Sequence, residues 1–196
     1  MKERTKLLTI HNITLIAVLS ALATAAYYLL EVPIIPFAPH LKVNFADIPS
    51  VIGGLVISPL AGLLVLVIRC AAHLFRTSTV GIGELMDILV GTSLLMPFML
   101  VYRKAATHFG STVSYTLAAA AGAVGAVIGG IIANSIFYPI FIYFVIGGKI
   151  ETFNAFLVYL GGTVIANLVR SGAAFIGCLP FLPLVPRFKK IINQHK

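Results

Sequence analysis

The chain has 196 residues, of which 59% are hydrophobic and only 10% are charged, and its formal net charge is +8. So little charge excludes a water-soluble domain of this size and indicates a polytopic membrane protein. The excess of cations does not indicate nucleic-acid binding, because the lysines and arginines flank apolar runs, as they do in membrane proteins anchored by positive charge.

Apolar runs separated by polar or proline-marked segments predict an all-α fold of six transmembrane helices. The second and third helices are short and are divided by the Ser58-Pro59 break, so that one enters the membrane and the other returns. The predicted spans, in chain order, are 7–30, 46–57, 59–75, 84–102, 112–146 and 153–185.

The distribution of positive charge predicts the orientation of these spans. Most lysines and arginines fall at the N-terminus, in the Arg103-Lys104 loop and at the C-terminus. These three places share one side only if the short pair of helices counts as two crossings. We therefore expect both termini in the cytoplasm and one transmembrane substrate-binding domain over residues 1–196.

Three charged side chains, Arg69, Asp87 and Arg170, lie within or near the ends of predicted spans. Each costs roughly 2.5–3.5 kcal/mol at a helix centre. One interpretation is snorkelling of the arginines or a single structural ion pair. The other is a polar pocket between the spans that opens outward, since charges inside a membrane usually serve a function.

Two amides extend this candidate pocket. Asn134 lies on the fifth span, and Asn167 lies three residues before Arg170, on the same helix face. An amide beside a guanidinium offers donors and an acceptor that suit a flat heterocycle with carbonyls and ring nitrogens. No metal-binding or catalytic motif is present, and the histidines are expected at membrane interfaces: His11, His40, His73, His108 and His195.

The loop before the second span alternates polar and apolar residues over 41–47. Prolines stiffen the chain on both sides of it, whereas the loop itself has no such restraint. We expect it to be a weakly held lid that orders over a ligand, because lids are drawn from segments of low local stability. Lys42 and Asn44 would supply polar contacts, and Phe45 an apolar cover.

The first span carries Ala17, Ala21 and Ala25 at intervals of four residues. Such stripes of small residues allow helices to approach closely. Packing inside the chain and docking to a partner membrane protein are both open.

The stretch LKVNFADIP at 41–49, followed by PLAG at 59–62 and Arg69, resembles the substrate-binding S-components of energy-coupling factor (ECF) transporters, particularly the riboflavin-specific branch. The resemblance implies six helices in the cell membrane, a vitamin bound near the outer face, and no enzymatic activity or cofactor. It also implies a transmembrane coupling subunit and two cytoplasmic ATPases, with the alanine stripe as a docking motif.

This sequence departs from the riboflavin-specific pattern at several positions. Asn44 replaces an Asp, Ser58 a Gly, Arg69-Cys70 a Lys-Asn pair and Asp87 an Asn. The element Asn167-x-x-Arg170 is similar to an Asn-x-x-Lys element that contacts the flavin. The expected ligand-binding residues are Lys42, Asn44, Phe45, Asp47, Arg69, Glu84, Asp87, Asn134, Asn167 and Arg170.

Three alternatives remain beside a flavin-binding S-component. The same architecture could bind a different vitamin or heterocycle, since the changed positions are those expected to contact the ligand. An intramembrane enzyme would use Asp87 and Arg69, but the sequence offers no nucleophile with a base at suitable spacing. A purely structural subunit is disfavoured by the cost of the intramembrane charges.

Overall fold

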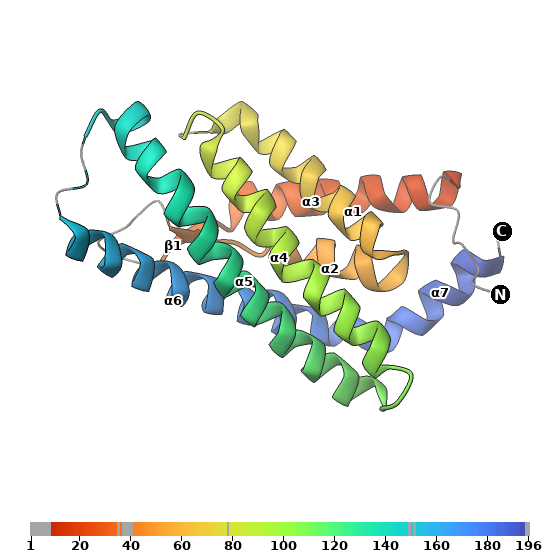
Figure 1. Cartoon of the computed structure of the whole chain (residues 1–196). Helices are drawn as coiled ribbons and strands as arrows, with labels where there is room; N and C mark the ends of the chain where they lie inside the picture. Colours follow the sequence, from red (N-terminus) through yellow and green to blue (C-terminus); the bar gives the residue numbers. More distant parts are fainter. Residues whose placement is uncertain are drawn as a thin grey trace.

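The computed structural model describes residues 9–34, 36, 41–77, 79–148, 150 and 152–194. The cations Lys2, Arg4 and Lys6, which helped to predict the orientation, lie outside these residues. Within them the chain forms helices and one two-stranded ribbon (Figure 1). The elements are α1 (Ile10–Leu29), β1 (Val32–Pro33), β2 (Lys42–Val43), α2 (Asp47–Val56), α3 (Pro59–His73), η1 (Leu74–Arg76), α4 (Ile82–Ala105), α5 (Ser111–Phe141), η2 (Ile142–Ile146), α6 (Phe153–Cys178), η3 (Leu179–Leu184) and α7 (Val185–Gln194).

Helix starts follow local capping signals in the sequence. The hydroxyl of Ser58 accepts a hydrogen bond from the backbone N–H of Ala61 at 3.1 Å, and Pro59 occupies the first turn of α3. Proline is well suited there, because its missing N–H would have no partner within the helix. The predicted division between the second and third helices is therefore confirmed.

In the described part of the chain, five helical stretches are long and apolar enough to cross a membrane. Helix α2 has only 10 residues, which at 1.5 Å per residue span about half of a ~30 Å hydrocarbon core. The structure thus supports five full-length candidate spans and one half-length helix, where the sequence predicted six spans.

The α-helix of the last predicted span ends earlier than expected. Helix α6 stops at Cys178, and the chain continues as the 3₁₀ segment η3 before α7 begins at Val185. Pro180 and Pro183 lie in η3, and each removes a backbone donor that a continued α-helix would need. The predicted helix 153–185 is therefore an α-helix followed by a 3₁₀ segment, within one continuous candidate span from Phe153 to Lys190.

The segment predicted to be an unrestrained loop is paired instead. Strand β2 lies antiparallel to β1, with Val43 opposite Val32 and Lys42 opposite Pro33. The side chain of Val43 is buried. The two residues of β2 thus tie the loop to the segment that follows α1, which the alternation of polar and apolar residues did not indicate.

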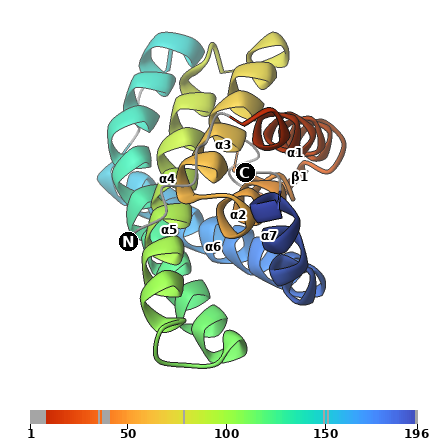
Figure 2. The ribbon, with the colours of Figure 1, turned by 90° about the vertical axis from the view of Figure 1, so that its right-hand side faces the viewer.

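Helices α4 and α5 pack closely against each other. Helices α4 and α5 run side by side in opposite directions (Figures 1 and 2). A Cβ atom added at Gly125 of α5 would lie 2.1 Å from the backbone oxygen of Ser93 in α4, so only glycine fits at this contact. In Figure 1 the first turn of α1, the α4–α5 loop and α7 lie toward one end of the molecule, and the ribbon lies toward the other.

Candidate functional site

A cavity opens between α1, α3, α4, α5, α6 and the β-ribbon. Most of the residues predicted to bind a ligand line it, although they come from distant parts of the sequence. These are Lys42, Asn44, Glu84, Asp87, Asn134, Asn167 and Arg170.

Three predicted ligand-binding residues do not line the cavity. Phe45 is 42% exposed and lies outside its wall. Asp47 and Arg69 are almost fully buried behind the wall, where they contact residues that do line it. The structure therefore gives Asp47 and Arg69 a position from which they support the cavity.

Four buried charges form a closed ring. One oxygen of Asp47 accepts from Arg69 Nη2 at 2.7 Å and from Arg170 Nη2 at 3.0 Å, while its other oxygen lies 2.5 Å from Arg170 Nε. Asp87 closes the ring, at 3.2 Å from Arg69 Nη2 and 2.5 Å from Arg170 Nη1. Two arginines and two aspartates balance in charge and join α2, α3, α4 and α6, which offsets the cost of burying them.

Arg170 was predicted to bind a ligand, but in the structure it belongs to the ring of charges. Its three guanidinium nitrogens all contact carboxylates within the protein, so it is oriented by Asp47 and Asp87. Beside it, Arg69 is fully buried, its guanidinium lies 5.5 Å from the ring centre of Tyr27, and its Nε and Nη1 find no hydrogen-bond partner among the described residues. That either arginine contacts a ligand stays a prediction.

The two predicted amides are held differently. Asn134 donates to the backbone oxygen of Gly130 at 2.8 Å and accepts from the hydroxyl of Tyr159 at 2.5 Å. Asn167 donates to the backbone oxygen of Thr163 at 2.9 Å. A Cβ atom at Gly130 would lie 2.2 Å from Asn167 Nδ2, so this glycine makes room for the amide in the cavity wall.

Two aromatic stacks also line the cavity, and no spacing or motif in the sequence indicated either of them. The rings of Tyr27 and His73 lie 4.0 Å apart at 8°, and those of Tyr138 and Tyr159 lie 3.6 Å apart at 15°. The first stack joins α1 to α3 and the second joins α5 to α6. His73 thus lies in the cavity wall and not merely at a membrane interface.

The β-ribbon forms one edge of the cavity. Lys42 pairs with Glu31 at 2.8 Å, and Asn44 accepts from the backbone N–H of Ala46 at 3.0 Å. These contacts, together with the pairing of β1 and β2, restrain the segment that was expected to be weakly held. Closure of 41–47 over a ligand stays a prediction, and it requires the segment to move from an already paired state.

The predicted docking stripe lies on the outer side of α1. Ala17, Ala21 and Ala25 are exposed, whereas the opposite side of the helix buries residues such as Leu19 and Ala23. Ordinary packing within the chain therefore does not cover the stripe, and its role in docking stays a prediction.

The family follows from a match along most of the chain. A family model described as the substrate-specific component of ECF transporters matches residues 11–180. The chain therefore belongs to this family, and five helical stretches in its described part are long and apolar enough to cross a membrane, as in a multi-pass membrane protein.

The chain is also similar to individual members of this family. The chain is 30% identical over 111 residues to the riboflavin transporter FmnP of Bacillus subtilis (strain 168), a match that covers 54% of this chain and 58% of that protein. Among solved structures, it is similar to the S component of a bacterial ECF transporter, with a TM-score of 0.74 at 20% identity over 90% of this chain and 95% of the other. At that identity the likeness concerns the fold alone.

Proposed function

We propose that the chain captures riboflavin, or a closely related flavin, from the extracellular side of the cell membrane. A transmembrane coupling subunit and two cytoplasmic ATPases would drive its release into the cell. In this proposal α2 counts as a crossing, which puts both termini in the cytoplasm. The cations Arg103 and Lys104 then lie on the same side as α7, as the positive-inside rule requires.

The observation that carries the ligand class is the pairing of aromatic stacks with amides in one cavity. Stacked rings such as Tyr138 and Tyr159 offer flat apolar surfaces to a planar ring system. Asn167 and Asn44 line the same cavity and provide amide groups that pair with carbonyls and ring nitrogens. The match to a protein named as a riboflavin transporter supports this ligand.

Flavin fluorescence provides the test. The full chain, purified in detergent, should quench riboflavin fluorescence on titration, with saturation at one ligand per chain. Thiamine and biotin, which lack a tricyclic ring, should not displace it. A preparation that leaves riboflavin fluorescence unchanged, although circular dichroism confirms its helical fold, would exclude a flavin as the ligand.

The second candidate is a different planar vitamin in the same cavity. The charge ring favours it, because Asp87 and Arg69 replace the Asn and Lys of the riboflavin-specific pattern, and Arg170 is already held by two carboxylates. Mass spectrometry of small molecules that co-purify with the protein distinguishes the candidates. A flavin mass supports the first, and a non-flavin heterocycle supports the second.

A further inference from the structure

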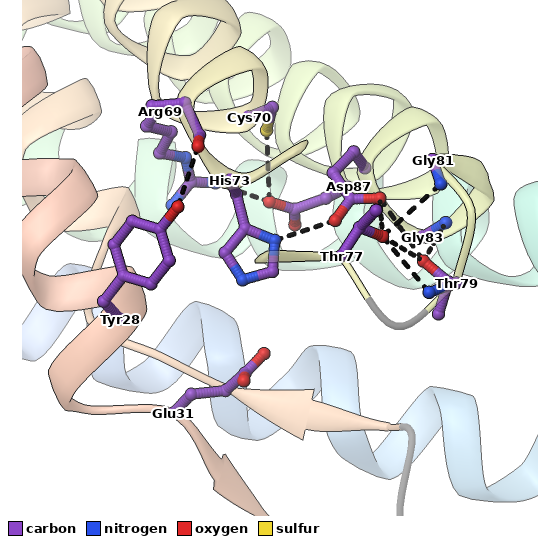
Figure 3. Close-up of polar contacts among 12 residues, drawn as sticks. Tyr28, Glu31, Arg69, Cys70, His73, Thr77, Thr79, Gly81, Gly83 and Asp87 are labelled. Carbon is purple, nitrogen blue, oxygen red and sulfur yellow. Dashed lines mark hydrogen bonds and ion pairs between the residues drawn. The ribbon is translucent and has the colours of Figure 1, made fainter. Parts of the chain in front are cut away.

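A polar cluster at the start of α4 lies apart from the charge ring. Glu84 is 4% exposed, and both of its oxygens are occupied. One lies 2.7 Å from Nδ1 of His73, and the other accepts from the hydroxyls of Thr77 at 2.9 Å and Thr79 at 3.3 Å. Figure 3 shows this cluster, which joins the end of α3 to the first turn of α4.

The contacts of the two threonines limit which atoms donate to Glu84. The backbone N–H groups of Thr79 and Gly81 donate to the hydroxyl oxygen of Thr77, at 3.1 and 3.4 Å, and Gly83 donates to that of Thr79 at 3.0 Å. The two threonine hydroxyls lie 3.0 Å apart, where either can donate to the other, so at least one of them donates to Glu84. A glutamate side chain in its ordinary form only accepts. Nδ1 of His73 must then carry the proton that it shares with Glu84.

In the neutral ring, a proton on Nδ1 leaves the second nitrogen of His73 as an acceptor. In a neutral imidazole with its proton on Nδ1, Nε2 has a free lone pair. Tyr27 covers one face of the ring at 4.0 Å, and Tyr28 tilts against it at 5.3 Å while its hydroxyl is tied to the backbone oxygen of Ala72. The ring is thus fixed in orientation, and in Figure 3 its second nitrogen is turned to the side on which Glu31 lies.

We propose that Nε2 of His73 accepts a hydrogen bond from an N–H or O–H group of the bound ligand, and that Glu84 is a positioning residue that keeps this nitrogen an acceptor. The proposal rests on the proposed function. It adds that the ligand carries a donor on the edge facing α3: the ring N–H of a flavin or a hydroxyl of its side chain. A ligand without that donor leaves a desolvated acceptor unpaired, which is the arrangement that gives strong discrimination.

The experiment compares three flavins on the full chain in detergent. They are riboflavin, 3-methylriboflavin, which lacks the ring N–H, and lumiflavin, which lacks the hydroxylated side chain. The wild-type protein should bind at least one of the two analogues about 10- to 100-fold more weakly than riboflavin. His73→Phe, which keeps a flat ring against Tyr27, should weaken riboflavin binding and reduce that preference to about threefold or less.

Two further variants separate a specific contact from a structural role. His73→Gln, whose amide reaches the place of Nε2, should recover part of the preference. Glu84→Gln keeps the size of the side chain but can donate to Nδ1, which turns Nε2 into a donor, so the preference should be lost as in His73→Phe.

The results distinguish failure of the proposed flavin binding from failure of the proposed contact to His73. If the wild-type protein binds no flavin, the proposed function fails and this inference fails with it. If it binds riboflavin but His73→Phe weakens all three flavins by the same factor, the residue is structural and only this inference is overturned. Loss of the preference in Glu31→Gln, with its retention in His73→Phe, would assign the acceptor to Glu31 and also overturn it.

Discussion

Asp47 and Glu31 allow the energetic role of the charge ring to be measured against a matched ion pair. The N–O distances are nearly equal, 2.7 Å for Arg69–Asp47 and 2.8 Å for Lys42–Glu31, but the side chains are 0% and 3% exposed in the first pair and 37% and 22% in the second. If the N–O distance alone decided, the two ion pairs would contribute equally to the free energy of unfolding. If burial decides, their contributions should differ greatly.

We expect Asp47→Asn to lower the free energy of unfolding by about 3–5 kcal/mol, because it leaves two buried guanidinium groups facing a single carboxylate. Glu31→Gln should cost only about 0.2–1 kcal/mol, because water solvates the lysine that remains. Both values can be measured by titrating the protein with sodium dodecyl sulfate in mixed micelles and following helix content by circular dichroism.

A double variant tests whether charge balance is the cause. Arg69→Gln combined with Asp87→Asn removes one charge of each sign, so it should be less destabilising than the two single changes added together, by about 0.5–3 kcal/mol. If Asp47→Asn and Glu31→Gln destabilise by equal amounts, or if the double variant is simply additive, the account of the ring as a balanced unit is refuted.

Three other predictions concern the rest of the molecule. Ala21→Trp should abolish ATP-driven uptake by the assembled transporter while ligand binding by the isolated chain is kept, and loss of binding would mean that the stripe is internal packing. Gly62→Ala should destabilise the protein by about 1–3 kcal/mol, because its Cβ would lie 2.6 Å from the backbone oxygen of Ser50. Gly161→Ala has open space around it and should be neutral or stabilising by up to about 1 kcal/mol. Equal effects of the two changes on thermal unfolding would contradict this packing. Hydrogen exchange of the amides in 41–47 should slow on adding saturating riboflavin, more than in α5, and unchanged exchange would exclude a lid.

The sequence predicted the arrangement of helices well, because length and hydropathy dominate in a membrane. It located the break at Ser58-Pro59, where capping and proline act locally. It did not predict that the α-helix of the last span ends at Cys178, because Pro180 and Pro183, which lack backbone donors, lie within an apolar run that continues the span. The β-ribbon was missed because two-residue strands leave no readable periodicity.

The site was predictable only in part. Arg69, Asp87 and Arg170 stood out because charges are costly in a membrane, and the structure brings them into contact with one another. Asp47 was expected to bind ligand but joins both arginines behind the cavity wall. His73 could not be singled out, because its partners Glu84 and Tyr27 come from other helices and no spacing in the sequence relates them.

The closed ring of four charges constrains how this protein can diverge. A single neutral replacement at Asp47 or Asp87 leaves an unmatched cation inside the membrane, so most routes away from the present sequence pass through an unstable intermediate. Paired exchanges that keep the total at zero avoid that barrier. Among descendants of this chain, the residues at 47, 69, 87 and 170 should therefore covary as a set, and a homologue with a neutral residue at 87 should carry a compensating charge elsewhere in the site, as the riboflavin-specific pattern does with an Asp in place of Asn44.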